Sequence, residues 1–180
     1  FLRDPKRMVM LHDVWYSGRG GATGLSAALA KARVCLRTLE SARVWDDVEL
    51  CAGEAIVVPP GPEAFVHDGW PIYAGPDLVY RPNDGRVVIV DWKTGDDSDA
   101  GLQIALYVLY CRTVLGIPFR DGEWFGRVVN LATGGDDTFE ISRLDVVQAA
   151  ERVRLSVEAM QSLLANPDRT PNPSKAPWYF

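Results

Sequence analysis

Two ionisable residues stand at the end of an apolar run, where Val87 to Val90 is followed by Asp91, Trp92 and Lys93. Side chains two positions apart on a β-strand leave the same face, so the carboxylate of Asp91 and the ammonium of Lys93 are expected side by side. Charged groups at the end of a buried strand are costly unless they are paired or bind a metal. The pair therefore predicts either an ordinary ion pair or part of a metal centre.

A second carboxylate, that of Asp77, is expected nearby. It begins the strand expected over 77–81, and the tetrad Pro82-Asn83-Asp84-Gly85 is suited to a tight turn before the strand of Asp91. A hairpin would bring the two carboxylates together, although Asp77 could instead cap the turn that follows Gly75. Magnesium prefers hard oxygen ligands and often takes one or two carboxylates. Such a site suits phosphodiester hydrolysis, in which the ion polarises the phosphoryl oxygen and activates water.

The following helix adds two polar side chains. Gln103 and Tyr107 are four residues apart and therefore share one helical face, from which they could contact a DNA phosphate or base. That face could equally pack on the sheet, with Tyr107 in the core. Lys93 could orient or deprotonate the attacking water, or neutralise charge on the pentacovalent phosphorus. The residues alone leave these alternatives open.

Three motifs together resemble the PD-(D/E)XK nuclease superfamily in its RecB-like branch. They are Gly75-Pro76-Asp77, the strand 88–95 ending in Asp-Trp-Lys-Thr-Gly, and the helix 103–107 that begins with Gln and ends with Tyr. The family pattern is G-x-x-D, D-x-K-T-G and Q-x-x-x-Y, so here the glycine precedes the aspartate by two positions instead of three. The resemblance covers about residues 63 to 165.

The resemblance implies a role for each matching residue. It implies metal ligation by Asp77, Asp91 and the backbone carbonyl of Trp92, catalysis by Lys93, and substrate contact by Gln103 and Tyr107. It also implies Mg²⁺ or Mn²⁺ as cofactor, DNA as substrate, and a place in recombination, repair or phage and mobile-element processing, with a helicase or recombination protein as a conceivable partner.

Two features of the family pattern are not matched. Relatives usually carry an earlier His or Glu ligand, for which His12 is a candidate unless the ligand lies upstream of Phe1. Many RecB-like proteins also hold an iron–sulfur cluster through cysteines, but the tail 171–178 contains none. We therefore expect no iron–sulfur cluster. The competing hypothesis is a nuclease-fold module that lacks part of its metal shell and only binds DNA or a partner protein.

The elements that must position these residues indicate an α/β fold, with a mixed central β-sheet flanked by helices, as in restriction-endonuclease-like cores. The acidic stretch Asp96-Asp97-Ser98-Asp99 is expected to cap the second helix. Hydrophobic periodicity and turn residues predict helices over 25–41, about 99–115 and 144–165, and strands over 48–58, 63–67, 70–74, 77–81, 87–93, 124–131 and 138–141.

Composition sets the broader expectations. A chain of 180 residues with 47% hydrophobic content predicts one nuclease-like domain over residues 1–180, which could be a fragment because it begins with Phe1. No signal peptide or membrane span is expected, and three scattered cysteines indicate reduced, mostly buried thiols, so a cytoplasmic location is expected. A net charge of −5 counts against non-specific wrapping of nucleic acid but not against a local site. The tryptophans, Trp70 among them, are expected to pack and not to stack on bases.

Overall fold

A five-stranded mixed β-sheet lies at the centre of the protein. The computed structural model describes residues 22–51, 55–56, 64–95 and 99–164. The sheet order is β1-β4-β5-β6-β7; β5 and β6 are parallel and the other neighbouring pairs are antiparallel. The strands are β1 (Ala55–Ile56), β4 (Leu78–Tyr80), β5 (Val87–Lys93), β6 (Trp124–Asn130) and β7 (Gly135–Glu140).

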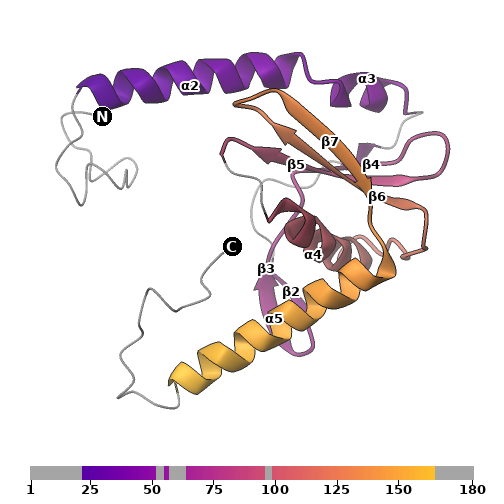
Figure 1. Cartoon of the computed structure of the whole chain (residues 1–180). Helices are drawn as coiled ribbons and strands as arrows, with labels where there is room; N and C mark the ends of the chain where they lie inside the picture. The colour runs from indigo at the N-terminus through magenta and orange to yellow at the C-terminus, as the bar shows by residue number, and fades with distance from the viewer. Residues whose placement is uncertain (1–21, 52–54, 57–63, 96–98, 165–180) are drawn as a thin grey trace.

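Helices cover both faces of this sheet (Figure 1). On one face lie α2 (Ala22–Glu40) and α3 (Val44–Glu49), and on the other lie α4 (Ala100–Thr113) and α5 (Arg143–Leu164). The fold is therefore a mixed α/β architecture of the restriction-endonuclease-like kind, as the sequence predicted. None of the helices in the ranges described is long and apolar enough to cross a membrane.

Strand β5 separates two hydrophobic cores. Val87 and Ile89 join the core on the α4 side, whereas Val88 and Val90 join the core that includes Val44 of α3. Successive side chains of a strand alternate between faces, and all four of these residues are buried. Because the period is two, Asp91 and Lys93 continue the series that faces α4.

A separate two-stranded hairpin packs beside α4. It consists of β2 (Ala64–His67) and β3 (Trp70–Tyr73), joined by Asp68 and Gly69, which have φ values of 50° and 83°. Positive φ at both loop residues suits a two-residue hairpin, so the turn expected there is confirmed. Phe65 packs edge-on against Tyr110 of α4, with ring centroids 5.8 Å apart. This contact fixes the hairpin against the helix.

The strand expected over 48–58 is wrong at its N-terminal end. Residues Val44–Glu49 form α3, and among the described residues of the expected range Ala55–Ile56 is strand. The β-branched valines suggested a strand, but the side chain of Val44 is fully buried in the helix. Asp46 and Asp47 lie in the first helical turn, where their negative charge interacts favourably with the helix dipole. Tertiary burial and helix electrostatics outweighed strand propensity here.

Two smaller expectations also need correction. The strand expected over 138–141 begins three residues earlier: the turn is 131–134 and β7 starts at Gly135, with Asp136 held in the strand by Arg127. Asp99 occupies the N-cap position of α4 without a side-chain cap hydrogen bond, and Asp96 to Ser98 lie outside the described residues. The remaining strands and helices lie within a few residues of their expected bounds, and Cys35, Cys51 and Cys111 are buried free thiols.

Candidate active site

The β4–β5 hairpin places the two candidate metal ligands opposite each other. Leu78 pairs with Val90, so extending this antiparallel register by one residue sets Asp77 opposite Asp91. Opposed residues of an antiparallel pair share a face, and their Cβ atoms are typically about 5 Å apart. Asp77 Oδ2 also accepts a hydrogen bond of 2.8 Å from the backbone N–H of Trp92. The expected hairpin is confirmed, and it orients Asp77 towards the end of β5.

Asp91 and Lys93 form a close ion pair on the α4 face of the sheet. Lys93 Nζ lies 2.7 Å from Asp91 Oδ2, with relative side-chain exposures of 19% and 3%. The strand period explains the pairing, because residues 91 and 93 leave β5 on the same side. The lysine thus opens to solvent while the carboxylate does not.

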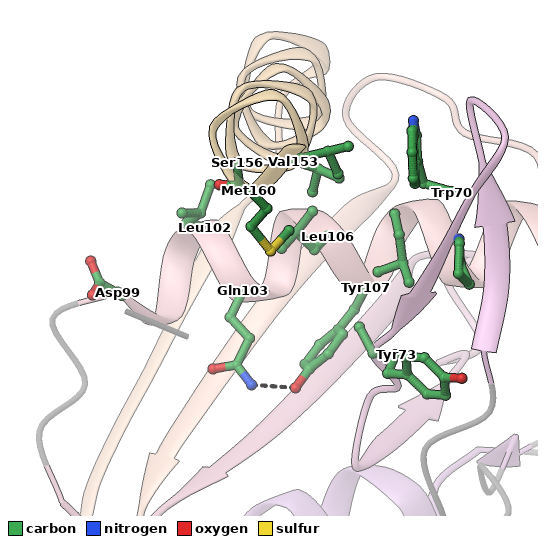
Figure 2. A pocket seen from close by; sticks show the side chains of 14 residues that line it. Trp70, Tyr73, Asp99, Leu102, Gln103, Leu106, Tyr107, Val153, Ser156 and Met160 are labelled. Atoms are coloured by element: carbon green, nitrogen blue, oxygen red, sulfur yellow. Dashed lines mark hydrogen bonds between the residues drawn. The ribbon is translucent and has the colours of Figure 1, made fainter. Parts of the chain in front are cut away.

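Helix α4 completes a closed ring of four polar side chains. Lys93 Nζ donates to Gln103 Oε1, Gln103 Nε2 donates to the Tyr107 hydroxyl, and that hydroxyl donates to Asp91 Oδ1 over 3.4 Å. Figure 2 shows Gln103 and Tyr107 extending from the same side of α4, with the bond between them dashed. The structure thus brings the two helix residues to Asp91 and Lys93, as their spacing suggested.

The electrostatics of this region disfavour uncompensated negative charge. Burial of the carboxyl group raises the pKa of Asp77, and the charge of Asp91 adds to the rise, while the Trp92 N–H and Lys93 oppose it. Burial likewise raises the pKa of the Tyr107 hydroxyl, again assisted by Asp91. Tyr107 therefore acts as a neutral hydrogen-bond donor at ordinary pH. A cation near Asp77 and Asp91 would relieve the repulsion between them.

The donor set fits a divalent ion. Within the described ranges, Asp91 Oδ2 is one of two buried side-chain polar atoms without a hydrogen-bond partner, although the Lys93 ammonium lies beside it. The backbone carbonyl of Lys93 accepts a 2.7 Å hydrogen bond from the N–H of Leu131 on the β6 side. Backbone groups of successive residues in a strand point to opposite sides, so the N–H and carbonyl of Trp92 face the β4 side, where Asp77 lies. Two carboxylates and a carbonyl on one side match the hard ligands of magnesium.

The described ranges contain no group of three or more His, Cys, Asp or Glu side chains placed to hold a metal. His12, the candidate for an additional ligand, lies outside them. Asp77, Asp91 and the Trp92 carbonyl therefore remain the candidate ligands.

Sequence reasoning missed Asn130, at the end of the strand beside β5. Its Nδ2 donates to Gly95 O over 2.9 Å, and its Oδ1 accepts from the N–H groups of Ala132 and Thr133. Asn130 pairs with Lys93 in the parallel register, so it anchors the chain where it leaves the candidate site. An asparagine closing an apolar strand was the available signal.

Comparison with known proteins assigns the chain to a nuclease class. A family profile described as the PD-(D/E)XK nuclease superfamily matches residues 5–175, and the chain belongs to this superfamily. A search of curated proteins finds no significant match. Membership supports nuclease activity on DNA, and enzymes of this superfamily typically use divalent metals such as Mg²⁺ or Mn²⁺.

Proposed function

We propose that the chain is a deoxyribonuclease that hydrolyses phosphodiester bonds with Mg²⁺ or Mn²⁺ held by Asp77, Asp91 and the Trp92 carbonyl. The observation that carries the proposal is the closed ring on β5 and α4, in which the buried carboxylate of Asp91 meets the Tyr107 hydroxyl at one oxygen and the Lys93 ammonium at the other. The ion would supply Lewis acidity to the phosphodiester.

Lys93 is proposed as the catalytic cation. An ammonium group has three donors, and the contacts with Asp91 and Gln103 engage two of them. The third can meet a phosphate oxygen or the attacking water, where positive charge stabilises the charge that develops in the transition state. Because Gln103 fixes the ammonium from the other side, this donor is oriented before substrate binds.

Gln103 and Tyr107 are proposed to position the reacting groups and the nearest part of the substrate. Tyr107 donates to Asp91 and accepts from Gln103, so both α4 residues set the orientation of the β5 pair. The same side chains line a groove beside the site, where substrate can reach them.

The finer assignments rest on the motifs. The D-x-K-T-G and Q-x-x-x-Y patterns support a RecB-like nuclease in recombination, repair or mobile-element processing, working as a single domain and with a helicase as a conceivable partner. The proposal includes no iron–sulfur cluster, because the tail 171–178 has no cysteine.

Cleavage assays on labelled DNA test the proposal. Single- and double-stranded substrates are incubated with the protein and Mg²⁺, and Lys93→Ala is compared with Lys31→Ala, a matched change at an exposed lysine of α2. Loss of one transition-state charge contact typically costs about 100-fold or more in rate. We expect such a loss for Lys93→Ala and wild-type rates for Lys31→Ala.

A second candidate function is a DNA- or protein-binding module without catalysis. The finding that favours it is the lack of a third acidic or histidine ligand within the described ranges. Metal-dependent cleavage by the wild type would exclude it. Binding without cleavage would contradict the nuclease proposal, and cleavage that survives Lys93→Ala would contradict the catalytic assignment of Lys93.

A further inference from the structure

An apolar groove of about 410 Å³ adjoins the ring of polar side chains. One wall is β3 of the hairpin, with Trp70 and Tyr73, and the opposite wall is α5, with Val153 and Met160. Helix α4 lies between them (Figure 2). The volume lies within the range of roughly 300–1,000 Å³ that is usual for ligand sites.

Two aromatic side chains of the hairpin stand open at this groove. Trp70 is 42% exposed and Tyr73 is 72% exposed, whereas Trp124 is fully buried. Trp45 is partly exposed, and its ring lies tilted against that of Trp92 with centroids 5.7 Å apart. The expectation that the tryptophans pack in the core is confirmed for Trp124, whereas Trp70 and Trp45 are partly exposed at the surface. Large open rings on a hairpin fixed by its turn and by Phe65 offer a preformed stacking surface.

The groove is continuous with the candidate active site. Gln103 and Tyr107 line it, and the same two side chains bond to Lys93 and Asp91. A molecule in the groove would thus touch the side chains that orient the proposed catalytic pair. A molecule in the groove would therefore lie next to a substrate bound at the candidate active site.

The charge of the lining restricts what part of a nucleic acid can enter. Among the described residues that line it, Asp99 is the single charged one, and the others are apolar, aromatic or neutral polar. Within this described lining a phosphate would meet a carboxylate and no cation, which disfavours entry of the nucleic-acid backbone. Bases within a duplex are stacked on their neighbours, and only an unstacked base offers a free flat face.

We propose that this groove binds an unstacked nucleobase of single-stranded DNA next to the phosphate that is cleaved. The base contacts the rings of both Trp70 and Tyr73, and Met160 and Leu106 cover its other surfaces. Gln103 and Ser156 offer polar atoms to its edge. The inference rests on the proposed nuclease function and assigns it a substrate class, single strands or frayed ends.

Binding measurements test the groove separately from catalysis. Fluorescence anisotropy with a fluorescein-labelled oligothymidylate in EDTA gives the dissociation constant without cleavage. Stacking on an aromatic side chain typically changes affinity by roughly 5- to 150-fold per base. We expect Trp70→Ala and Tyr73→Ala each to weaken binding about tenfold, Tyr73→Phe to retain it, and Val66→Ala to leave it unchanged.

Val66 is the matched control because it lies on the same hairpin, is 62% exposed and does not line the groove. A second probe carries abasic residues in place of the thymidines. Wild type should bind the abasic probe as weakly as Tyr73→Ala binds the intact oligonucleotide. The Tyr73→Ala substitution should not weaken binding of the abasic probe further, because that probe has no base to contact the ring.

The outcomes separate the two proposals. Failure of wild type to bind single strands, unchanged dissociation constants in both alanine variants, or equal losses on intact and abasic probes would overturn the groove assignment. The first two results are also expected if a peptide, or another segment of this chain, occupies the groove. If wild type cleaves DNA and the alanine variants bind as wild type does, the nuclease proposal holds and the groove assignment fails. If Tyr73→Ala loses binding but wild type does not cleave DNA, the groove assignment holds and the nuclease proposal fails.

Discussion

Asp91 and Lys93 illustrate why an ion pair at a strand end need not be there for stability. Taking two charges out of water costs several kcal/mol per ion, and their attraction offsets this only with good additional hydrogen bonding. Here Gln103 bonds to Lys93 and Tyr107 bonds to Asp91 Oδ1, while Asp91 Oδ2 has only the lysine beside it. The arrangement is better explained by a reactant or ion that completes it than by a gain in folding free energy.

Asp77→Asn is expected to make the metal-free protein more stable at neutral pH. The raised pKa of Asp77 means that the folded state holds this proton more tightly than the unfolded chain, whose ordinary value is 3.8. Stability therefore falls as pH rises from that value through the folded pKa, and asparagine removes the loss. Its side-chain oxygen can still accept from Trp92. Urea unfolding in EDTA, from about pH 4 to pH 7, measures the difference between the two proteins.

Magnesium reverses the comparison. Wild type should gain thermal stability from the ion and Asp77→Asn should gain less, because binding to the folded state alone stabilises it. A variant that is no more stable than wild type at pH 7 in EDTA would contradict the electrostatic argument. An equal magnesium response in both proteins would remove Asp77 from the ligand set.

At the scale of elements, the site depends on how closely α4 approaches the sheet. Gly126 of β6 pairs with Ile89 of β5, and a Cβ placed on it would lie 2.8 Å from side-chain atoms of both Ile104 and Phe139. Ile104 is fully buried and is the residue after Gln103. The glycine therefore lets α4 sit near enough for Gln103 to reach Lys93.

Gly126→Ala is expected to destabilise the fold by about 1–3 kcal/mol, the usual cost of overpacking a core. Because the new methyl group pushes on α4, DNA cleavage should fall as well. Gly101→Ala is the control, because a Cβ placed there would meet no atom within 4 Å beyond its own stretch of helix. Inside a helix, alanine is more stable than glycine by roughly 0.5–1 kcal/mol, so this variant should not lose stability. Urea midpoints and cleavage rates are measured for both variants. A Gly126→Ala midpoint equal to that of wild type would contradict the argument that Gly126 allows α4 to approach the sheet closely.

The order of elements could be predicted where the pattern was strong. Strand β5 has four consecutive buried apolar residues between a turn and a charged end, so both its existence and its bounds could be predicted. The face shared by Asp91, Lys93 and the α4 pair followed from the periods of strand and helix. These inferences needed only local geometry.

What could not be predicted depended on distant contacts. Nothing near Val44 in the sequence reveals that its side chain is fully buried in a helix, and nothing near Asp136 reveals that Arg127 holds it in a strand. Likewise, Trp70 and Trp124 look alike in sequence, yet one is open and one is buried. Burial arises from the packing of whole elements, so residue type alone cannot decide it.

At the scale of the molecule, the two faces of the sheet have different roles. The α4 face carries the candidate active site, whereas on the α3 side the buried residue Arg127 connects separate elements. Its Nε and Nη2 donate to the two carboxylate oxygens of Asp136, each over 2.7 Å, and Nη1 donates to Asp47 of α3 and to the Tyr80 hydroxyl of β4. One guanidinium thus joins α3, β4, β6 and β7.

Arg127→Ala should therefore destabilise the whole fold, because it leaves the carboxylates of Asp47 and Asp136 without their cationic partner. Removing one partner of a buried pair costs about 3–5 kcal/mol, and partial exposure of Asp47 and Asp136 places this case near the lower end, about 3 kcal/mol.

Arg154→Ala is the matched control, since Arg154 also pairs with two carboxylates, Glu151 and Glu158, but on the exposed surface of α5. Its urea midpoint should stay close to that of wild type. Equal effects of the two substitutions would show that burial does not set the strength of the Arg127 cluster. A selective loss of magnesium response in folded Arg127→Ala would show that the two faces of the sheet are coupled.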